Sequence, residues 1–236
     1  MLMRGAGGSR ENVRPYAEML ARNGYGVLAP DLRGHGESEN QRNRLAWQGT
    51  RDVGAAVDFV RERSEVQLIG GLGISMGAEA LLGAASQYPA IEGIVADSAT
   101  RRSIEELPAL ESEQPLVRNL TARVMYATVR ALTDDKPPPP LPDSMVEARS
   151  TRFLAIAGGA KELEARSNEP FAETVGSRAT LWVAPGASHA GASARYPDEY
   201  ERRVIALFDA ARLTGGRSRA APLRPLSIVT AQPRSG

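Results

Sequence analysis

The stretch from Val66 to Ala85, VQLIGGLGISMGAEALLGAA, decides the fold. Its first five residues form a short apolar run that is typical of a buried strand. Residues 77–85 are apolar nearly all round, which predicts a helix packed deep against a sheet. Between them lies the GxSxG motif Gly73-Ile-Ser-Met-Gly77. After a strand and before a helix, this motif predicts a strained turn that exposes the Ser75 hydroxyl, with glycines flanking it because larger side chains would collide with backbone.

On both sides of this stretch, short apolar runs alternate with helical patterns. Such alternation predicts an α/β fold with a mostly parallel sheet and helices on both faces. Helices are expected around residues 13–21, 53–60, 77–85 and 119–132, and from Pro197 onward. The expected strands are Met1–Met3, Tyr25–Ala29, Val66–Gly70, Ile91–Ala96, Phe153–Ala157 and Thr180–Ala184.

The composition is that of an ordinary globular protein, with 236 residues, 42% apolar and 24% charged. We expect one domain over residues 1–213, with a cap insertion at about 100–150. A proline-rich run, Lys136–Pro142, predicts a stiff extended spacer in that insertion. Residues 214–236 are rich in Gly, Pro, Ser and Arg and predict a disordered tail.

Charge and residue usage exclude several classes of function. The chain has no cysteine, so a cysteine nucleophile, a thiolate metal site and a disulfide framework are excluded. The formal charge is +1, and the tail holds four arginines without an acidic residue, so the body is net negative and does not favour nucleic acid. No long apolar run or signal peptide is visible. We expect a soluble, cytoplasmic protein without membrane contact.

The glycines of the central stretch also allow a rival interpretation. Gly71, Gly73 and Gly77 lie between a strand and a helix, and Asp97 ends the next strand. A dinucleotide-binding unit has such a glycine cluster, with an acid about 20 residues further on to hold a ribose. This interpretation gives no role to Ser75 or His189.

Three further segments carry a resemblance to a known family. Arg4-Gly-Ala-Gly-Gly-Ser9 follows the first expected strand, Asp31-Leu-Arg-Gly-His-Gly-Glu-Ser38 follows the second, and Pro185-Gly-Ala-Ser-His-Ala-Gly191 follows the last. Together with GxSxG, in this order, they resemble the α/β-hydrolase family from Met1 to about Leu213. The resemblance implies an α/β-hydrolase fold with a small helical cap.

The resemblance also implies roles for particular residues. Ser75 would be the nucleophile and His189, late in the chain, the general base. The main-chain N–H groups of Met76 and Ala6 would form the oxyanion hole. Arg4 stands where the family has a histidine, a change of small consequence if the loop acts through its backbone. His35 is interpreted as structural or as part of the site lining.

The orienting acid is the open assignment. The family places it just after the strand Phe153–Ala157, where this chain has Gly158-Gly-Ala-Lys-Glu-Leu-Glu-Ala165. Its usual position falls near Lys161, which cannot serve. Glu162 and Glu164 are the candidates, with a slight preference for Glu162 because it is nearer the strand end. Asp97 is a third possibility.

We therefore expect a serine hydrolase, most simply a carboxylesterase for small or medium acyl esters, without metal or organic cofactor. A nucleotide-binding oxidoreductase and an inactive truncated hydrolase scaffold are the alternatives. The family sheet usually has two more strands at its start, so we expect a fragment or a late-starting version of a longer protein, whose missing part could have held a signal or anchor. Tyr25–Ala29 would then be an exposed sheet edge, open to homo-oligomerisation.

Overall fold

The fold was analysed in a computed structural model that describes residues 1–5, 10–34, 36, 38, 47–63, 66, 68–100, 106, 116–132 and 139–214. Five strands form one sheet in the order β1-β2-β3-β4-β5, and every neighbouring pair is parallel. The predicted α/β class with a mostly parallel sheet is confirmed. The strands are β1 (Leu2–Met3), β2 (Ile69–Ile74), β3 (Ile91–Asp97), β4 (Arg152–Gly158) and β5 (Ala179–Ala184).

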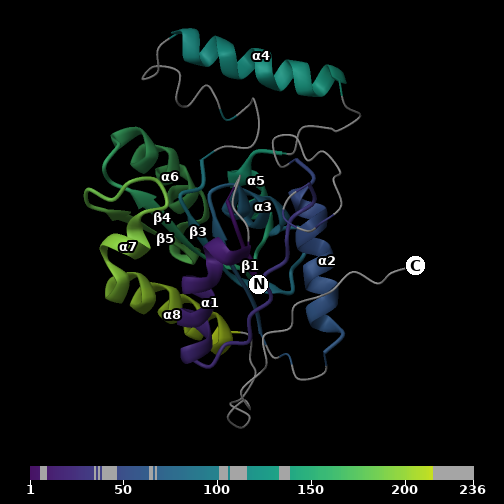
Figure 1. The fold of residues 1–236 in the computed structure, drawn as a ribbon, viewed down its shortest axis with the longest axis vertical. Coiled ribbons are helices and arrows are strands. Elements are labelled where there is room, and N and C mark those ends of the chain that lie inside the picture. Colours follow the sequence, from purple (N-terminus) through teal and green to yellow (C-terminus); the bar gives the residue numbers. More distant parts are fainter. Residues whose placement is uncertain are drawn as a thin grey trace.

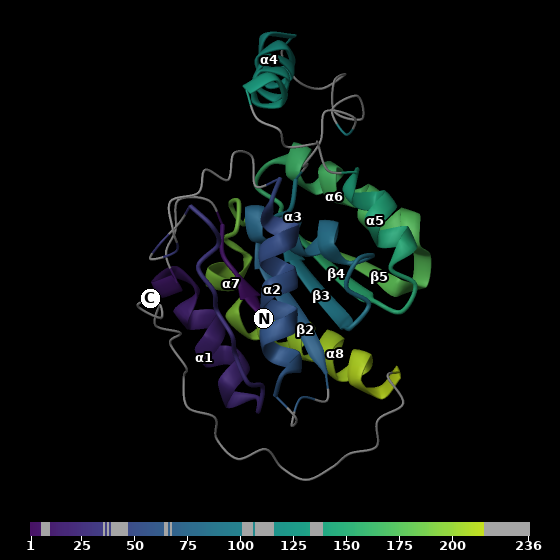
Figure 2. The same cartoon turned by 90° about the vertical axis from the view of Figure 1, so that its right-hand side faces the viewer.

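Helices cover both faces of the sheet (Figures 1 and 2). One apolar cluster packs α2, α3, α5 and α6 against one face, and a second packs α1 and α8 against the other. Strand side chains alternate between the two: in β4, Phe153 faces the first cluster and Leu154 the second. The helices are α1 (Arg14–Arg22), α2 (Gly49–Arg61), α3 (Met76–Ala84), α4 (Leu116–Leu132), α5 (Leu141–Glu147), α6 (Glu162–Val175), α7 (Ala192–Arg195) and α8 (Pro197–Thr214), with 3-10 turns η1 (Arg10–Val13) and η5 (Gly176–Arg178).

Strand β2 lies further toward the carboxyl end than the sequence predicts. We expected a strand at Val66–Gly70, whereas β2 runs from Ile69 through three glycines to Ile74. The glycines are needed for packing: a Cβ at Gly70 would lie 2.7 Å from the Phe208 ring, and one at Gly71 would lie 2.8 Å from Leu81. Glycine disfavours an isolated strand, but here it lets side chains of α8 and α3 approach the sheet closely.

The predicted strand Tyr25–Ala29 is wrong. These residues form no strand, and one backbone hydrogen bond, from Leu2 N–H to Leu28 O at 2.8 Å, joins them to β1. β1 has only two residues, so it offers little backbone for a longer ladder. The side chains of Tyr25, Val27 and Ala29 still pack against the second cluster, which explains the strand-like apolar pattern.

The expected insertion at about 100–150 divides into two parts. α4 lies outside the body of the molecule, above α3 and α5 (Figures 1 and 2). α5, in contrast, belongs to the body, because Leu141 and Met145 are buried in the first apolar cluster. The expected spacer Lys136–Pro142 therefore ends earlier than predicted: its last two residues open α5, where proline is tolerated in the first turn.

Two further expectations concern the carboxyl-terminal tail and contact with a membrane. Beyond Thr214, the predicted disordered tail lies outside the described residues. Within the described helices, none combines the length and the apolar character that crossing a bilayer requires.

Candidate active site

The GxSxG motif forms a sharp turn between β2 and α3. Ser75 alone separates the two elements and has a φ of 51°, a conformation that costs a non-glycine residue energy. Its N–H donates to the carbonyl oxygen of Asp97 at 2.7 Å. A Cβ at Gly73 would lie 2.5 Å from the backbone of Ala78, and one at Gly77 would lie 2.4 Å from the carbonyl oxygen of Met3. The sterically required glycines agree with the prediction from sequence.

Backbone strain is concentrated around this turn. Among the described non-glycine residues, positive φ angles occur at Ser75, at Ser98 (57°) and at Ala190 (54°). Ser75 and Ser98 follow the carboxyl ends of β2 and β3, and Ala190 lies in the loop after β5. The carboxyl edge of a parallel sheet is where α/β folds place their ligand sites, and strained residues persist where the surrounding structure holds them.

The loop after β5 brings His189 to the serine. The His189 Nε2 atom lies 3.0 Å from Ser75 Oγ, and its Nδ1 atom lies 3.1 Å from Glu164 Oε2. With Nδ1 protonated, the imidazole donates to the carboxylate and its Nε2 is free to accept the serine proton. A serine, a histidine and a carboxylate thus form one continuous line of hydrogen bonds.

The carboxylate in this line is Glu164, and the preference for Glu162 is wrong. Both residues lie in the first turn of α6. Because they are two positions apart, their side chains point in directions that differ by more than half a helical turn. Glu162 points into solvent and pairs with Arg166 at 2.9 Å, whereas the side chain of Glu164 is only 8% exposed. Glu164 also accepts a hydrogen bond from Gly158 N–H at 2.8 Å.

The helix that carries Glu164 was missed in the sequence because its buried face is partly polar. The buried positions of α6 are Glu164, Asn168, Phe171 and Val175, a helical spacing in which only the last two are apolar. Pro170 inside the helix disguised the pattern further, because proline normally argues against a helix interior.

The electrostatics of the pair favour an ionised carboxylate beside the imidazole. Hydrogen bonding to Glu164 raises the pKa of His189 above its ordinary value, against the opposing effect of burial. Burial acts to raise the pKa of Glu164, but hydrogen bonds from His189, Gly158 and Ser98 outweigh it, so that this pKa is lowered. Both shifts have the direction expected when an imidazole approaches a carboxylate.

Candidate oxyanion donors are the main-chain N–H groups next to Ser75. Met76 is the first residue of α3, so its N–H is free of helix hydrogen bonds and lies at the positive end of the helix dipole. Ala6, the second expected donor, lies outside the described residues. Gly5 lies directly before it, and a Cβ there would come within 3.4 Å of Ser75 Cβ. The first glycine of the glycine-rich segment therefore lies next to the side chain of Ser75.

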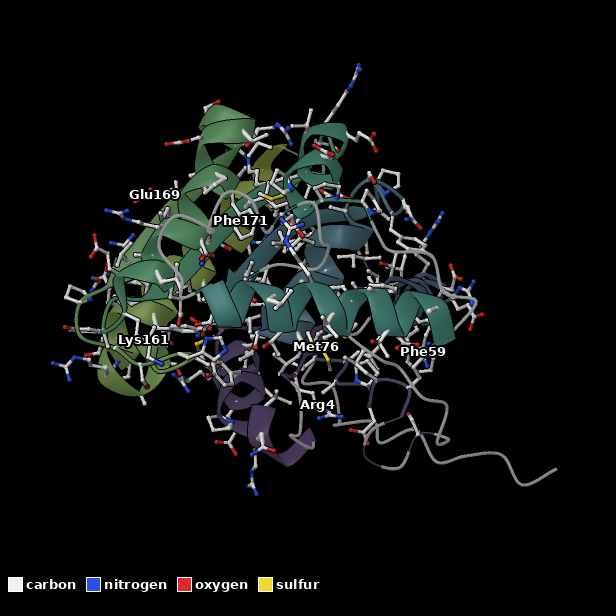
Figure 3. All side chains as sticks on the ribbon, turned by 90° about the horizontal axis from the view of Figure 1, so that it is seen from above. Arg4, Phe59, Met76, Lys161, Glu169 and Phe171 are labelled. Carbon is white, nitrogen blue, oxygen red and sulfur yellow. The ribbon has the colours of Figure 1, made fainter. Side chains whose placement is uncertain are left out.

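Arg4, which stands where the family has a histidine, is a buried part of this loop. Its side chain is 1% exposed, and its Nε atom lies 3.6 Å from Asp31 Oδ1. Burial lowers the pKa of Arg4 while the charge of Asp31 raises it. A Cβ at Gly77, the residue after Met76, would lie 2.6 Å from Arg4 O, so the Arg4 backbone adjoins the start of α3; Figure 3 labels Arg4 and Met76 in a view from above. The ion pair ties the first loop to the start of the Asp31–Ser38 segment, whose His35 lies outside the described residues.

Asp97 is neither the carboxylate beside His189 nor an acid that could hold a ribose, the two roles that the sequence suggested for it. It is fully buried, and it accepts hydrogen bonds from Ser98 Oγ and Tyr200 OH, both at 3.0 Å. Burial raises the pKa of Asp97 to about 6. Because the carboxylate is enclosed, it cannot hold a ribose. Gly71 and Gly73 lie within β2 rather than in a phosphate-binding loop, so the dinucleotide-binding interpretation is wrong.

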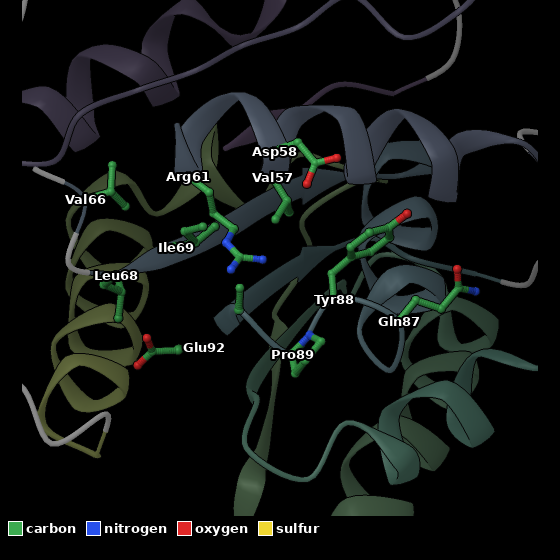
Figure 4. A pocket seen from close by; sticks show the side chains of 11 residues that line it. Val57, Asp58, Arg61, Val66, Leu68, Ile69, Gln87, Tyr88, Pro89 and Glu92 are labelled. Carbon is green, nitrogen blue, oxygen red and sulfur yellow. The ribbon is translucent and has the colours of Figure 1, made fainter. Parts of the chain in front are cut away.

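A pocket of about 510 Å³ lies elsewhere on the molecule (Figure 4). It is bordered by Val57 and Arg61 of α2 and by Ile69 and Ala90, where β2 and β3 begin. This is the end of the strands opposite to Ser75. Over the described part of the chain, no cluster of three or more His, Asp or Glu side chains is suited to hold a metal ion.

The parallel sheet, its two helical layers and the strained serine turn define the α/β-hydrolase class. Within that class, the profile of the Hydrolase_4 family, described as serine aminopeptidase S33, matches residues 1–138. This is more than half of the chain, and the protein belongs to this family.

Individual relatives agree with this assignment. A thermostable monoacylglycerol lipase of Bacillus sp. (strain H-257) is 32% identical over 96 residues, which span 40% of this chain and 38% of the lipase. An esterase of Pyrococcus furiosus has a similar structure, with a TM-score of 0.69 and 21% identity over 89% of this chain and 80% of the esterase. The structure of a monoacylglycerol lipase of Paleococcus ferrophilus is also similar, with a TM-score of 0.61 and 18% identity. The match covers 89% of this chain and 93% of that lipase. At these identities, the structural likeness establishes the fold alone.

Proposed function

We propose that this protein is a serine hydrolase that cleaves carboxylic esters through an acyl-enzyme on Ser75. The observation that carries the proposal is the line of hydrogen bonds from Ser75 through His189 to Glu164, with distances of 3.0 and 3.1 Å. Serine is a weak nucleophile at neutral pH and needs a neighbouring base held in the correct tautomer. This line supplies the base and the group that holds it.

The reaction has two halves. Ser75 Oγ attacks the ester carbonyl and transfers its proton to His189 Nε2, forming a tetrahedral oxyanion. His189 then gives the proton to the departing alkoxide as the carbon–oxygen bond breaks, leaving an acyl-serine. Water attacks the acyl-serine, His189 removes a proton from that water, and the proton returns to Ser75 as the carboxylic acid leaves.

The oxyanion would be stabilised by main-chain donors. Met76 N–H is one, and Ala6 N–H in the glycine-rich loop is the other. Loss of one such donor costs about 3 kcal/mol in comparable enzymes. Glu164 stays ionised through both halves and stabilises the imidazolium that forms on His189.

The relatives support an ester rather than an amide as substrate. They are described as an esterase and as monoacylglycerol lipases, while the family as a whole carries an aminopeptidase description. We propose an uncharged ester with a small or medium acyl chain, of which a monoacylglycerol is one test case. Hydrolysis of p-nitrophenyl esters, monoacylglycerols and aminoacyl p-nitroanilides, measured side by side, separates these possibilities. Turnover of the anilides alone would contradict the ester assignment.

Labelling with a fluorophosphonate probe tests the nucleophile directly. We expect one covalent adduct, located by mass spectrometry on Ser75, and none on Ser75→Ala. Ser167→Ala is the matched control, because Ser167 lies in α6 and its hydroxyl donates to the carbonyl oxygen of Leu163. A folded wild-type protein that neither reacts with the probe nor hydrolyses an ester would support the inactive-scaffold alternative instead.

A further inference from the structure

Asp97 and Ser98 connect the two halves of the candidate site, although neither belongs to the line of hydrogen bonds described above. The carbonyl oxygen of Asp97 accepts the N–H of Ser75 at 2.7 Å. On the other side, Ser98 Oγ accepts the N–H of Ala190, the residue after His189, at 2.8 Å. One dipeptide at the end of β3 therefore contacts both the nucleophile turn and the histidine turn.

The Ser98 hydroxyl is surrounded by hydrogen-bond partners, two carboxylates and one N–H group. It donates to Asp97 Oδ1 at 3.0 Å, which leaves its lone pairs for Ala190 N–H. The backbone of Ser98 is also fixed, because its own N–H donates to the carbonyl oxygen of Ile156 at 2.7 Å. Ser98 has the left-handed φ of 57°. A strained residue whose N–H and hydroxyl are both hydrogen-bonded is typical of a site whose geometry is held by its surroundings.

Asp97 is in turn held by residues of α8 and α1, on the face of the sheet that the second apolar cluster covers. Tyr200 of α8 donates to Asp97 Oδ2 at 3.0 Å. Tyr16 packs edge-on against Tyr200, with ring centroids 5.7 Å apart, and its hydroxyl shares a hydrogen bond of 2.8 Å with Ser193. Burying an acidic group is costly, so a carboxyl enclosed this way at a strand end requires an explanation beyond packing.

We propose that Ser98, oriented by Asp97, is a positioning residue that holds the histidine turn in register with the nucleophile turn. Because it concerns how His189 is held for its reaction with Ser75, this inference rests on the proposed function. Ser98 touches neither substrate nor reacting atoms; it acts on the imidazole through Ala190, the residue after His189, and through its hydrogen bond with Glu164.

The groups around the two titrating residues come from several elements. The charges that raise the pKa of His189 belong to Glu164 on α6, Asp97 on β3 and Glu79 on α3. Asp97 in turn faces Ser98, Tyr200, Glu164 and His189, with the Tyr16 hydroxyl beyond Tyr200. The buried carboxylate of Asp97 is thus one of three acidic groups whose loss should lower the pKa of His189.

The kinetics of two variants separate the effect of losing the Ser98 hydroxyl from the effect of relieving the backbone strain at Ser98. In Ser98→Ala the hydroxyl is lost and the strained backbone is kept, and in Ser98→Gly the hydroxyl is lost and the strain is relieved. We expect kcat to fall roughly ten-fold in both, the effect of about one hydrogen bond, with KM nearly unchanged. Wild-type kcat in either variant would overturn the proposal. Ser86→Ala, in the turn that follows α3, is the control and should keep wild-type kcat.

A measurement that needs no turnover tests the link to His189. The chain has only two histidines, so proton NMR in His35→Gln follows the His189 ring alone. In that background Asp97→Asn should lower the pKa of His189, because a negative charge is lost. Asp58→Asn, an exposed carboxylate of α2, should leave it unchanged. An unchanged His189 pKa in Asp97→Asn would contradict the proposal.

Folding and function can be told apart in this design. If Asp97→Asn fails to fold, Tyr200→Phe removes one hydrogen bond to Asp97 while keeping the aromatic packing. That variant should raise the pKa of Asp97 further and shift the His189 titration; an unchanged titration would overturn the proposal. A wild-type protein that hydrolyses no ester would refute the proposed function, while the NMR shifts would still test the coupling of Asp97 and Ser98 to His189.

Discussion

The difference between Glu162 and Glu164 is a difference of direction on one helical turn, and it predicts opposite outcomes for the same substitution. Glu164→Gln should lower kcat by roughly 10³ to 10⁴, as loss of the charged orienting group does in comparable triads. Glu162→Gln should leave kcat within about two-fold, because its carboxylate is exposed and pairs only with Arg166, a contact of small energy. Ester hydrolysis by the two purified variants is the measurement. Equal losses in both would contradict the assignment of Glu164.

The pH dependence of the reaction follows from His189. The imidazole must be neutral to accept the serine proton, and hydrogen bonding to Glu164 raises its pKa above the ordinary value of 6.5. We therefore expect kcat/KM to fall on acidification with a midpoint above 6.5, and the midpoint to move to lower pH in Glu164→Gln. A rate profile for a p-nitrophenyl ester between pH 5 and 9 checks this. A rate that stays flat down to pH 5 would exclude His189 as the base.

At this scale the sequence predicted the serine and the histidine because both sit in motifs whose residues have distinct chemistry. It could not choose between the glutamates, because the choice depends on where α6 begins. The role of Ser98 was also hidden: its hydroxyl lies 92 positions from Ala190 in the chain and contacts that residue only after folding.

At the scale of elements, an aromatic pair joins α4 to the residue that lies two positions before α2. Tyr126 stacks on Trp47 at a centroid distance of 6.0 Å and an interplanar angle of 13°, and both rings are buried. Leu120 and Val124 of the same helix are exposed. Trp47→Ala should therefore increase hydrogen–deuterium exchange across residues 116–132, since such a pair contributes about 1 kcal/mol beyond its buried area.

The control for α4 is Leu120→Ala, which removes exposed surface and should leave exchange unchanged. If α4 lies over the path of the substrate, Trp47→Ala should also change KM for longer acyl esters more than for acetate. Unchanged exchange in Trp47→Ala would show that contacts other than the Trp47–Tyr126 pair hold the helix.

Elements with a clear apolar pattern could be predicted, and those with a partly polar face or next to prolines could not. Helix α8 was found from its apolar face, and strands β3, β4 and β5 from their apolar runs. α5 was hidden by four consecutive prolines before it, and Tyr25–Ala29 imitated a strand because its side chains are half-buried. In each failure, tertiary contacts overrode the local pattern.

At the scale of the whole molecule, the edge of the sheet beside β1 predicts how two copies of the chain would associate. The segment that follows α1 meets β1 through a single backbone hydrogen bond, and weakly covered edges tend to pair with another chain. We propose that two copies associate through this edge. Sedimentation velocity should show a concentration-dependent dimer that Gly26→Lys, at an exposed position of this segment, weakens about ten-fold and Val183→Lys, on the opposite edge strand β5, does not. A monomer at all concentrations would refute the proposal.

The anchoring of Glu164 in a helix also has a consequence for how this chain can vary. Within the first turn of α6 the position of Glu164 is fixed, because one residue inserted or deleted between Glu162 and Glu164 would rotate the carboxylate by about 100° around the helix axis. Libraries or natural variants with altered length there should lose turnover while keeping their fold. Attempts to redesign substrate preference are better directed at the segment between β3 and α5, which lies outside this helical turn.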